Sequence, residues 1–107
     1  MASIDIKHGT VGPTHDPYST TTIIFTKTDG TEVELYRSEF GTSLKVNGFH
    51  YASTQAGGGL KTFDEQVASI EEEFERLTGM TPDKAEHIYN TRLYQPDLMG
   101  EYYGFNI

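Results

Sequence analysis

The chain contains no cysteine, which excludes disulfide bonds, thiolate catalysis and zinc or iron–sulfur centres held by cysteine. It also has no run near the ~18 apolar residues that a membrane-spanning helix requires. The segment from Met1 to Thr10 carries Asp5 and Lys7 and lacks the apolar stretch of a signal peptide. We therefore expect a cytoplasmic protein that does not enter a membrane.

Basic residues are scarce: Lys and Arg together number 8, against 16 Asp and Glu, which gives a formal net charge of −8. Proteins that bind the phosphate backbone of nucleic acids need a surplus of Lys and Arg, so direct nucleic-acid binding is not expected. Hydrophobic residues make up 36% of the chain, beside 11 glycines, which is sufficient for a folded core. The length then predicts a single domain over 1–107.

Residues 1–53 have the pattern of β-strands. Ile4 and Ile6 alternate with charged residues, a period of two that is typical of a half-buried strand. Two further pairs of apolar segments flank Asp29-Gly30 and Asn47-Gly48, dipeptides that favour the tight turn of a β-hairpin. This half of the chain is therefore predicted to form an antiparallel meander of four to five strands.

Two-residue turns would fix the register of both hairpins. In the first hairpin, Thr28 would pair with Thr31, and Ile24 would face Leu35 on the core side of the sheet. In the second hairpin, the same rule places a set of apolar side chains on one face: Leu44, Val46, Phe49 and Tyr51.

Residues 54–61 form a Gly-rich connection, and residues 62–107 form an acidic helical half with an aromatic tail. Thr62 and Glu65 have the spacing of a capping box, and Gly79 stands where a glycine commonly ends a helix. Between them, one apolar stripe recurs at helical spacing: Phe63, Val67, Ile70, Phe74 and Leu77. Thr81-Pro82 then starts a second, shorter helix. The predicted fold class is α+β, with the meander packed against the long amphipathic helix and the shorter one.

The negative charge is concentrated in the helical half. Residues 1–61 carry five basic and six acidic side chains, whereas residues 62–107 carry three basic and ten acidic ones. Four of these acidic residues form a cluster past the middle of the long helix, where the N-terminal dipole no longer stabilises them: Glu71, Glu72, Glu73 and Glu75. The cluster is interpreted either as a solvated face or as a recognition surface for a basic partner.

The Gly-rich connection allows a ligand-binding alternative that would use Gly57, Gly58, Gly59 and Lys61. It is not a P-loop, because Leu60 separates Gly59 from Lys61. Backbone N–H groups before a helix can still hold an anion, although the acidic residues at the start of this helix would repel it. The other interpretations are a mobile linker and a loop that becomes ordered on a partner.

The last residues are rich in aromatic side chains, among them Tyr102, Tyr103 and Phe105. Tyrosine is favoured at interfaces because it combines a large apolar area with a hydrogen-bonding tip. This tail either completes the core or forms an exposed patch for a partner, including a second copy in a homodimer.

No pattern of catalytic or metal-binding residues is present. The four histidines lack metal-ligand spacing, and no serine stands in a nucleophile motif, so we expect no enzymatic activity, no metal and no cofactor. The favoured function is a non-enzymatic acidic protein of the inhibitor or immunity type, which mimics nucleic-acid charge and occupies a basic surface of a partner protein. The alternatives are a small-ligand or nucleotide-binding domain and a structural subunit of a larger assembly.

Overall fold

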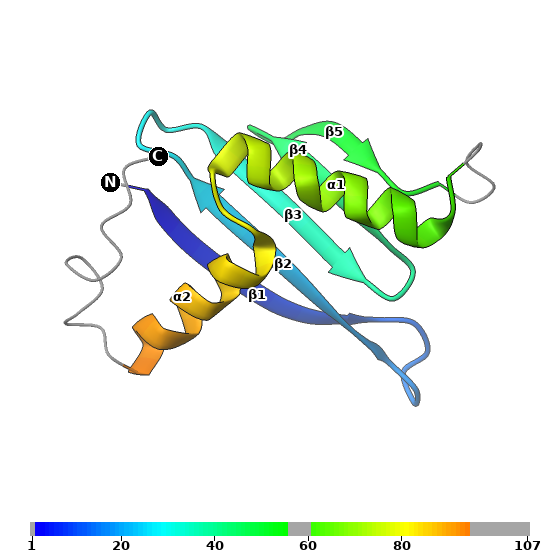
Figure 1. The fold of residues 1–107 in the computed structure, drawn as a ribbon. Helices are drawn as coiled ribbons and strands as arrows, with labels where there is room; N and C mark the ends of the chain where they lie inside the picture. The colour runs from blue at the N-terminus through cyan, green and yellow to red at the C-terminus, as the bar shows by residue number, and fades with distance from the viewer. Residues whose placement is uncertain (1, 56–60, 95–107) are drawn as a thin grey trace.

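The computed structural model describes residues 2–55 and 61–94, which form an antiparallel sheet in the order β1-β2-β3-β4-β5, followed by two helices. The elements are β1 (Ser3–Val11), β2 (Tyr18–Thr26), β3 (Glu32–Ser38), β4 (Gly41–Val46), β5 (Phe49–Ser53), α1 (Phe63–Thr78) and α2 (Pro82–Tyr94). Both helices lie on the same face of the sheet, α1 against β3 to β5 and α2 against β1 and β2 (Figure 1). The predicted α+β class, with a five-stranded meander, is confirmed.

The register predicted for the first hairpin is wrong by one residue. Ile23 pairs with Leu35, and the chain turns through a three-residue loop in which the Lys27 N–H donates to the Thr31 carbonyl at 2.8 Å. Gly30, with φ 90°, takes the left-handed position of that loop. Because side chains alternate along a strand, the extra loop residue moves Ile24 away from the core and brings its neighbours Ile23 and Phe25 into it.

The second hairpin begins with the predicted register, Val46 opposite Phe49. Asn47 and Gly48 both have positive φ, 52° and 82°, as its two-residue turn requires. A bulge then shifts the pairing. The expected apolar face is buried only in part, since Leu44 is fully buried whereas Phe49 is 77% exposed and Tyr51 44% exposed. β5 is an edge strand, so these side chains have the sheet on one side only.

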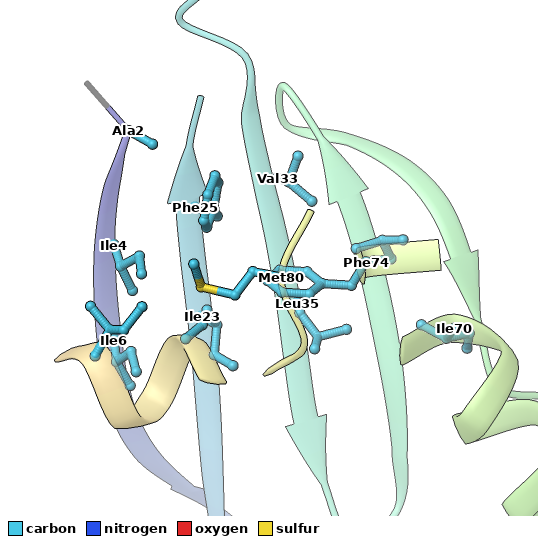
Figure 2. Close-up of a cluster of buried hydrophobic side chains, with 13 residues drawn as sticks. Ala2, Ile4, Ile6, Ile23, Phe25, Val33, Leu35, Ile70, Phe74 and Met80 are labelled. Carbon is cyan, nitrogen blue, oxygen red and sulfur yellow. The ribbon is translucent and has the colours of Figure 1, made fainter. Parts of the chain in front are cut away.

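The core lies between the helices and the inner face of the sheet (Figure 2). The ring of Phe74 from α1 meets Phe25 edge to face, with centroids 6.4 Å apart. The predicted cap of α1 is present, since Thr62 and Glu65 bond to each other's backbone N–H groups. The buried apolar side chains come from β1 to β4, from both helices, from the residue before β1 and from the connection between the helices. They are Ala2, Ile4, Ile6, Ile23, Phe25, Val33, Leu35, Leu44, Ile70, Phe74, Met80, Ala85 and Ile88.

In the part of the chain that the structure describes, neither helix is both long and apolar enough to cross a membrane. The same residues contain no group of three or more His, Asp or Glu side chains placed to hold a metal ion.

Candidate functional site

A groove of about 260 Å³ runs between α1 and the start of α2, and four carboxylates line it: Glu71, Glu72, Glu75 and Asp83. Its other lining residues are Ala68, Thr81 and Pro82. Glu75 lies one helical turn from both Glu71 and Glu72, at i,i+4 and i,i+3, so its side chain neighbours both of theirs on the helix surface. The capping bond from the Lys84 N–H to the Thr81 hydroxyl, 3.2 Å long, fixes the start of α2 on the opposite side. We call this feature the interhelical groove.

One arginine from the sheet neutralises part of this charge. Arg37 follows Leu35 on the inner face of β3, and its guanidinium lies 3.2 Å from Glu71, 3.7 Å from Asp83 and 3.4 Å from Glu86. Three carboxylates thus share one cation, and this local cluster keeps an excess of negative charge.

Glu72 and Glu75 form no ion pair within residues 2–55 and 61–94, and both side chains are exposed. They therefore remain available to a cation from outside the molecule. Since two unpaired carboxylates lie beside a cluster that is already negative, the interhelical groove favours a positively charged occupant.

Glu73, the fourth member of the predicted cluster, lies outside the groove. Arg76 donates two hydrogen bonds to its carboxylate, of 2.9 Å and 2.8 Å, and the Tyr51 hydroxyl donates a third of 2.8 Å. These bonds, chiefly those from Arg76 and then the one from Tyr51, lower the pKa of Glu73 to about 2. The same contacts raise the pKa of Arg76. Glu73 therefore has a cation already and connects α1 to β5.

The predicted glutamate cluster is thus divided by the structure, which groups Glu71, Glu72 and Glu75 and adds Asp83 to them. The sequence contained a signal for Asp83, because the Thr81-Pro82 helix start places it in the first turn of a helix that follows α1 closely. Nothing in the sequence indicated that Arg37 would reach both helices.

The glycines of the ligand-binding alternative lie outside the described part of the chain: Gly57, Gly58 and Gly59. The aromatic residues predicted to bind a partner lie outside it as well: Tyr102, Tyr103 and Phe105. Lys61 is described, and its ammonium group donates to the Ser69 hydroxyl at 2.8 Å. At the start of α1, the N–H groups of Thr62 and Glu65 bond to the helix's own cap. These two donors are therefore not available to an anion.

A second hollow, of about 360 Å³, lies on the sheet face away from the helices, where β3 and β4 meet. It is larger than the interhelical groove, but no charged side chain lines it. Its lining residues include Val11, Tyr36 and Phe40, and the Phe40 ring meets Tyr18 edge to face at 4.9 Å between centroids. No pattern in the sequence predicted this hollow, because its lining comes from the ends of β1, β3 and β5 and the start of β4, which are far apart along the chain.

Comparison with known proteins gives this chain no relative: no family model, no curated protein and no solved structure matches it.

Proposed function

We propose that this protein is a non-enzymatic binding protein, of the inhibitor or immunity type, whose interhelical groove binds a basic surface of a partner protein. The observation that supports the proposal most directly is the presence of Glu72 and Glu75 without a cation, beside Glu71 and Asp83. Their charges would gain a counter-charge on binding and would steer a basic partner towards the groove.

The shape of the groove indicates how a basic side chain would enter it. Ala68 and Pro82 contribute apolar surface between the carboxylates. An arginine or lysine can lay its methylene groups on such a surface while its charged end reaches the carboxylates. A surface that binds nucleic-acid phosphates presents side chains of this kind in rows, so it is the type of partner surface that we favour.

The proposal is tested by removing the two unpaired charges. We expect the full chain to bind an arginine-rich peptide in low salt, and this binding should change the NMR chemical shifts of amides in α1 and α2. The Glu72→Gln/Glu75→Gln variant should bind the same peptide about tenfold or more weakly. This corresponds to a loss of ~1.4 kcal/mol from two carboxylate contacts. The affinity of the unmodified chain should also fall steeply as salt is added.

The matched control is Glu32→Gln/Glu39→Gln, which removes the same charge at two exposed positions away from the groove. Equal weakening by both double variants would show that only net charge matters and would contradict the proposal. Binding unchanged in the groove variant would also contradict it. The alternative of a small-ligand or nucleotide site around Gly57, Gly58 and Gly59 stays a prediction from the sequence.

A further inference from the structure

The larger hollow, of about 360 Å³, lies on the face of the sheet that carries neither helix (Figure 1), and it shares no lining residue with the interhelical groove. We call it the outer hollow. Leu35 is buried in the core, so its neighbour Tyr36 lies on the outer face of β3, and Ser43 of β4 pairs directly opposite it. The turn between these strands adds Phe40, whose side chain is 64% exposed. The volume falls within the range of ligand sites, about 300–1,000 Å³.

Hydrogen bonds hold the walls of the outer hollow in place. The Ser38 hydroxyl accepts a bond of 3.2 Å from the Phe40 N–H within the turn between β3 and β4. The Thr54 hydroxyl accepts a bond of 3.2 Å from the Thr42 N–H, and the Thr54 N–H donates to the Thr42 carbonyl at 3.0 Å. The Phe40 ring is held by its edge-to-face contact with Tyr18. The outer hollow is therefore preformed, and a ligand would lose little free energy in ordering it.

The lining of the outer hollow indicates a neutral ligand. Among the described residues that line it, none is charged and none is Asn or Gln. A charged group would lose its hydration there without gaining a counter-charge. Over residues 2–55 and 61–94, the hydroxyls of Tyr36 and Ser43 form no hydrogen bond, so both remain available to a ligand.

Aromatic rings with a few hydroxyl donors are what a proline-rich segment requires. Such a segment is a preformed polyproline II helix, and it docks in grooves lined by aromatic side chains. Its carbonyls have no intrachain partner and need donors, which Tyr36 and Ser43 can supply. A sugar fits the outer hollow less well, because its many hydroxyls need strong acceptors such as carboxylate or amide side chains, and the lining has neither.

We propose that the outer hollow binds a proline-rich segment of a partner protein in the polyproline II conformation. A proline ring packs against Phe40, and carbonyls of the segment accept hydrogen bonds from Tyr36 and Ser43. This site uses no charge and lies on the opposite face of the sheet from the interhelical groove. Failure of this proposal and failure of the proposed function can therefore be told apart, because Glu72→Gln/Glu75→Gln should leave proline-rich binding unchanged.

The test is an NMR titration of the full chain with decaproline, blocked at both ends so that it carries no charge. We expect chemical shift changes at the amides of Phe40, Ser43 and Thr54. Because no ion pair forms, the affinity should stay constant as salt is added, in contrast to binding at the interhelical groove. A neutral Gly-Ser peptide of the same length should not bind. Shift changes caused by a neutral oligosaccharide such as maltohexaose, and not by decaproline, would overturn the proposal.

Two substitutions separate the ring from the hydroxyl. Phe40→Ala should weaken decaproline binding about tenfold or more. Tyr36→Phe keeps the ring and removes one donor, so it should weaken binding about three- to tenfold. The matched control is Phe49→Ala, which removes a phenylalanine that is 77% exposed and does not line the outer hollow. Equal weakening by Phe40→Ala and Phe49→Ala, or no shift changes at millimolar decaproline, would contradict the proposal.

Discussion

At the scale of single residues, Glu73 has the most strongly lowered pKa among the acidic side chains that the structure describes. Its partners are Arg76 and the Tyr51 hydroxyl, and they lower its pKa from 4.5 to about 2. A carboxyl group whose pKa is lower in the folded protein contributes stability above the unfolded pKa, and that contribution is lost as the pH falls through the folded pKa. The relevant pH window is therefore about 4.5 down to 2.

This window gives a prediction for Glu73→Gln. At pH 7 the variant should be less stable than the unmodified chain, because its neutral amide accepts weaker hydrogen bonds from Arg76 than a carboxylate does. The difference should shrink as the pH falls from 4.5 towards 2, where Glu73 itself becomes protonated. Urea denaturation across this pH range measures it.

Tyr51→Phe is a second variant for the same test. It removes the hydrogen bond from the Tyr51 hydroxyl, which lowers the pKa of Glu73 less than the hydrogen bonds from Arg76 do. It should show a smaller difference with the same pH dependence. A stability difference for Glu73→Gln that is constant between pH 7 and pH 2 would show that the carboxylate contributes through packing, and not through its charge.

At the scale of elements, Arg37 is the side chain that connects β3 to both helices. It contacts Glu71 on α1 and Asp83 and Glu86 on α2, and its own side chain is only 29% exposed. Removing the cation leaves three neighbouring carboxylates without a counter-charge, which is more costly than losing an ordinary surface ion pair.

We therefore expect Arg37→Leu to destabilise the fold by about 1–3 kcal/mol, with the largest effect on α2. Hydrogen exchange should be faster in the amides of α2 than in those of β3 and β4. Arg37→Lys keeps the charge but cannot bridge three carboxylates with a planar guanidinium, so it should recover only part of the stability. Uniform acceleration throughout the sheet and both helices would contradict this role for Arg37.

The elements themselves were predictable where the signal was local. The cap formed by Thr62 and Glu65, the Asn47-Gly48 turn and the order of strands and helices follow from neighbouring residues, and the structure has all of them. The register predicted for the first hairpin is wrong because Asp29-Gly30 suits both a two-residue and a three-residue loop. The choice between them is made by burial of Ile23 and Phe25, which depends on the helices that pack over the sheet.

The candidate site was only partly predictable for the same reason. Helical periodicity alone cannot tell which glutamates of a cluster face a second helix, so Glu73 was grouped with the others. Arg37 and Asp83 are separated by more than forty residues in the sequence, and their ion pair exists only after α2 packs on the sheet.

At the scale of the whole molecule, the net charge of −8 leaves open whether the groove carboxylates serve solubility, stability or binding. Glu72 and Glu75 are one helical turn apart, and Glu71 and Glu75 form a like-charge pair at i,i+4. Each such pair destabilises a helix by about 0.2–0.5 kcal/mol. Residues that a fold keeps at a cost to its own stability are typical of functional sites.

The Glu72→Gln/Glu75→Gln variant should therefore be slightly more stable than the unmodified chain in low salt, by about 0.5 kcal/mol. The gain comes from relief of repulsion, and so it should disappear in 1 M salt, where the screening length is about 3 Å. Thermal unfolding at low and high salt measures both values, with Glu32→Gln/Glu39→Gln as the control for net charge alone. A groove variant that is less stable than the unmodified chain at every salt concentration would mean that these carboxylates support the fold. A gain that salt removes, together with loss of basic-peptide binding, is what a recognition surface requires.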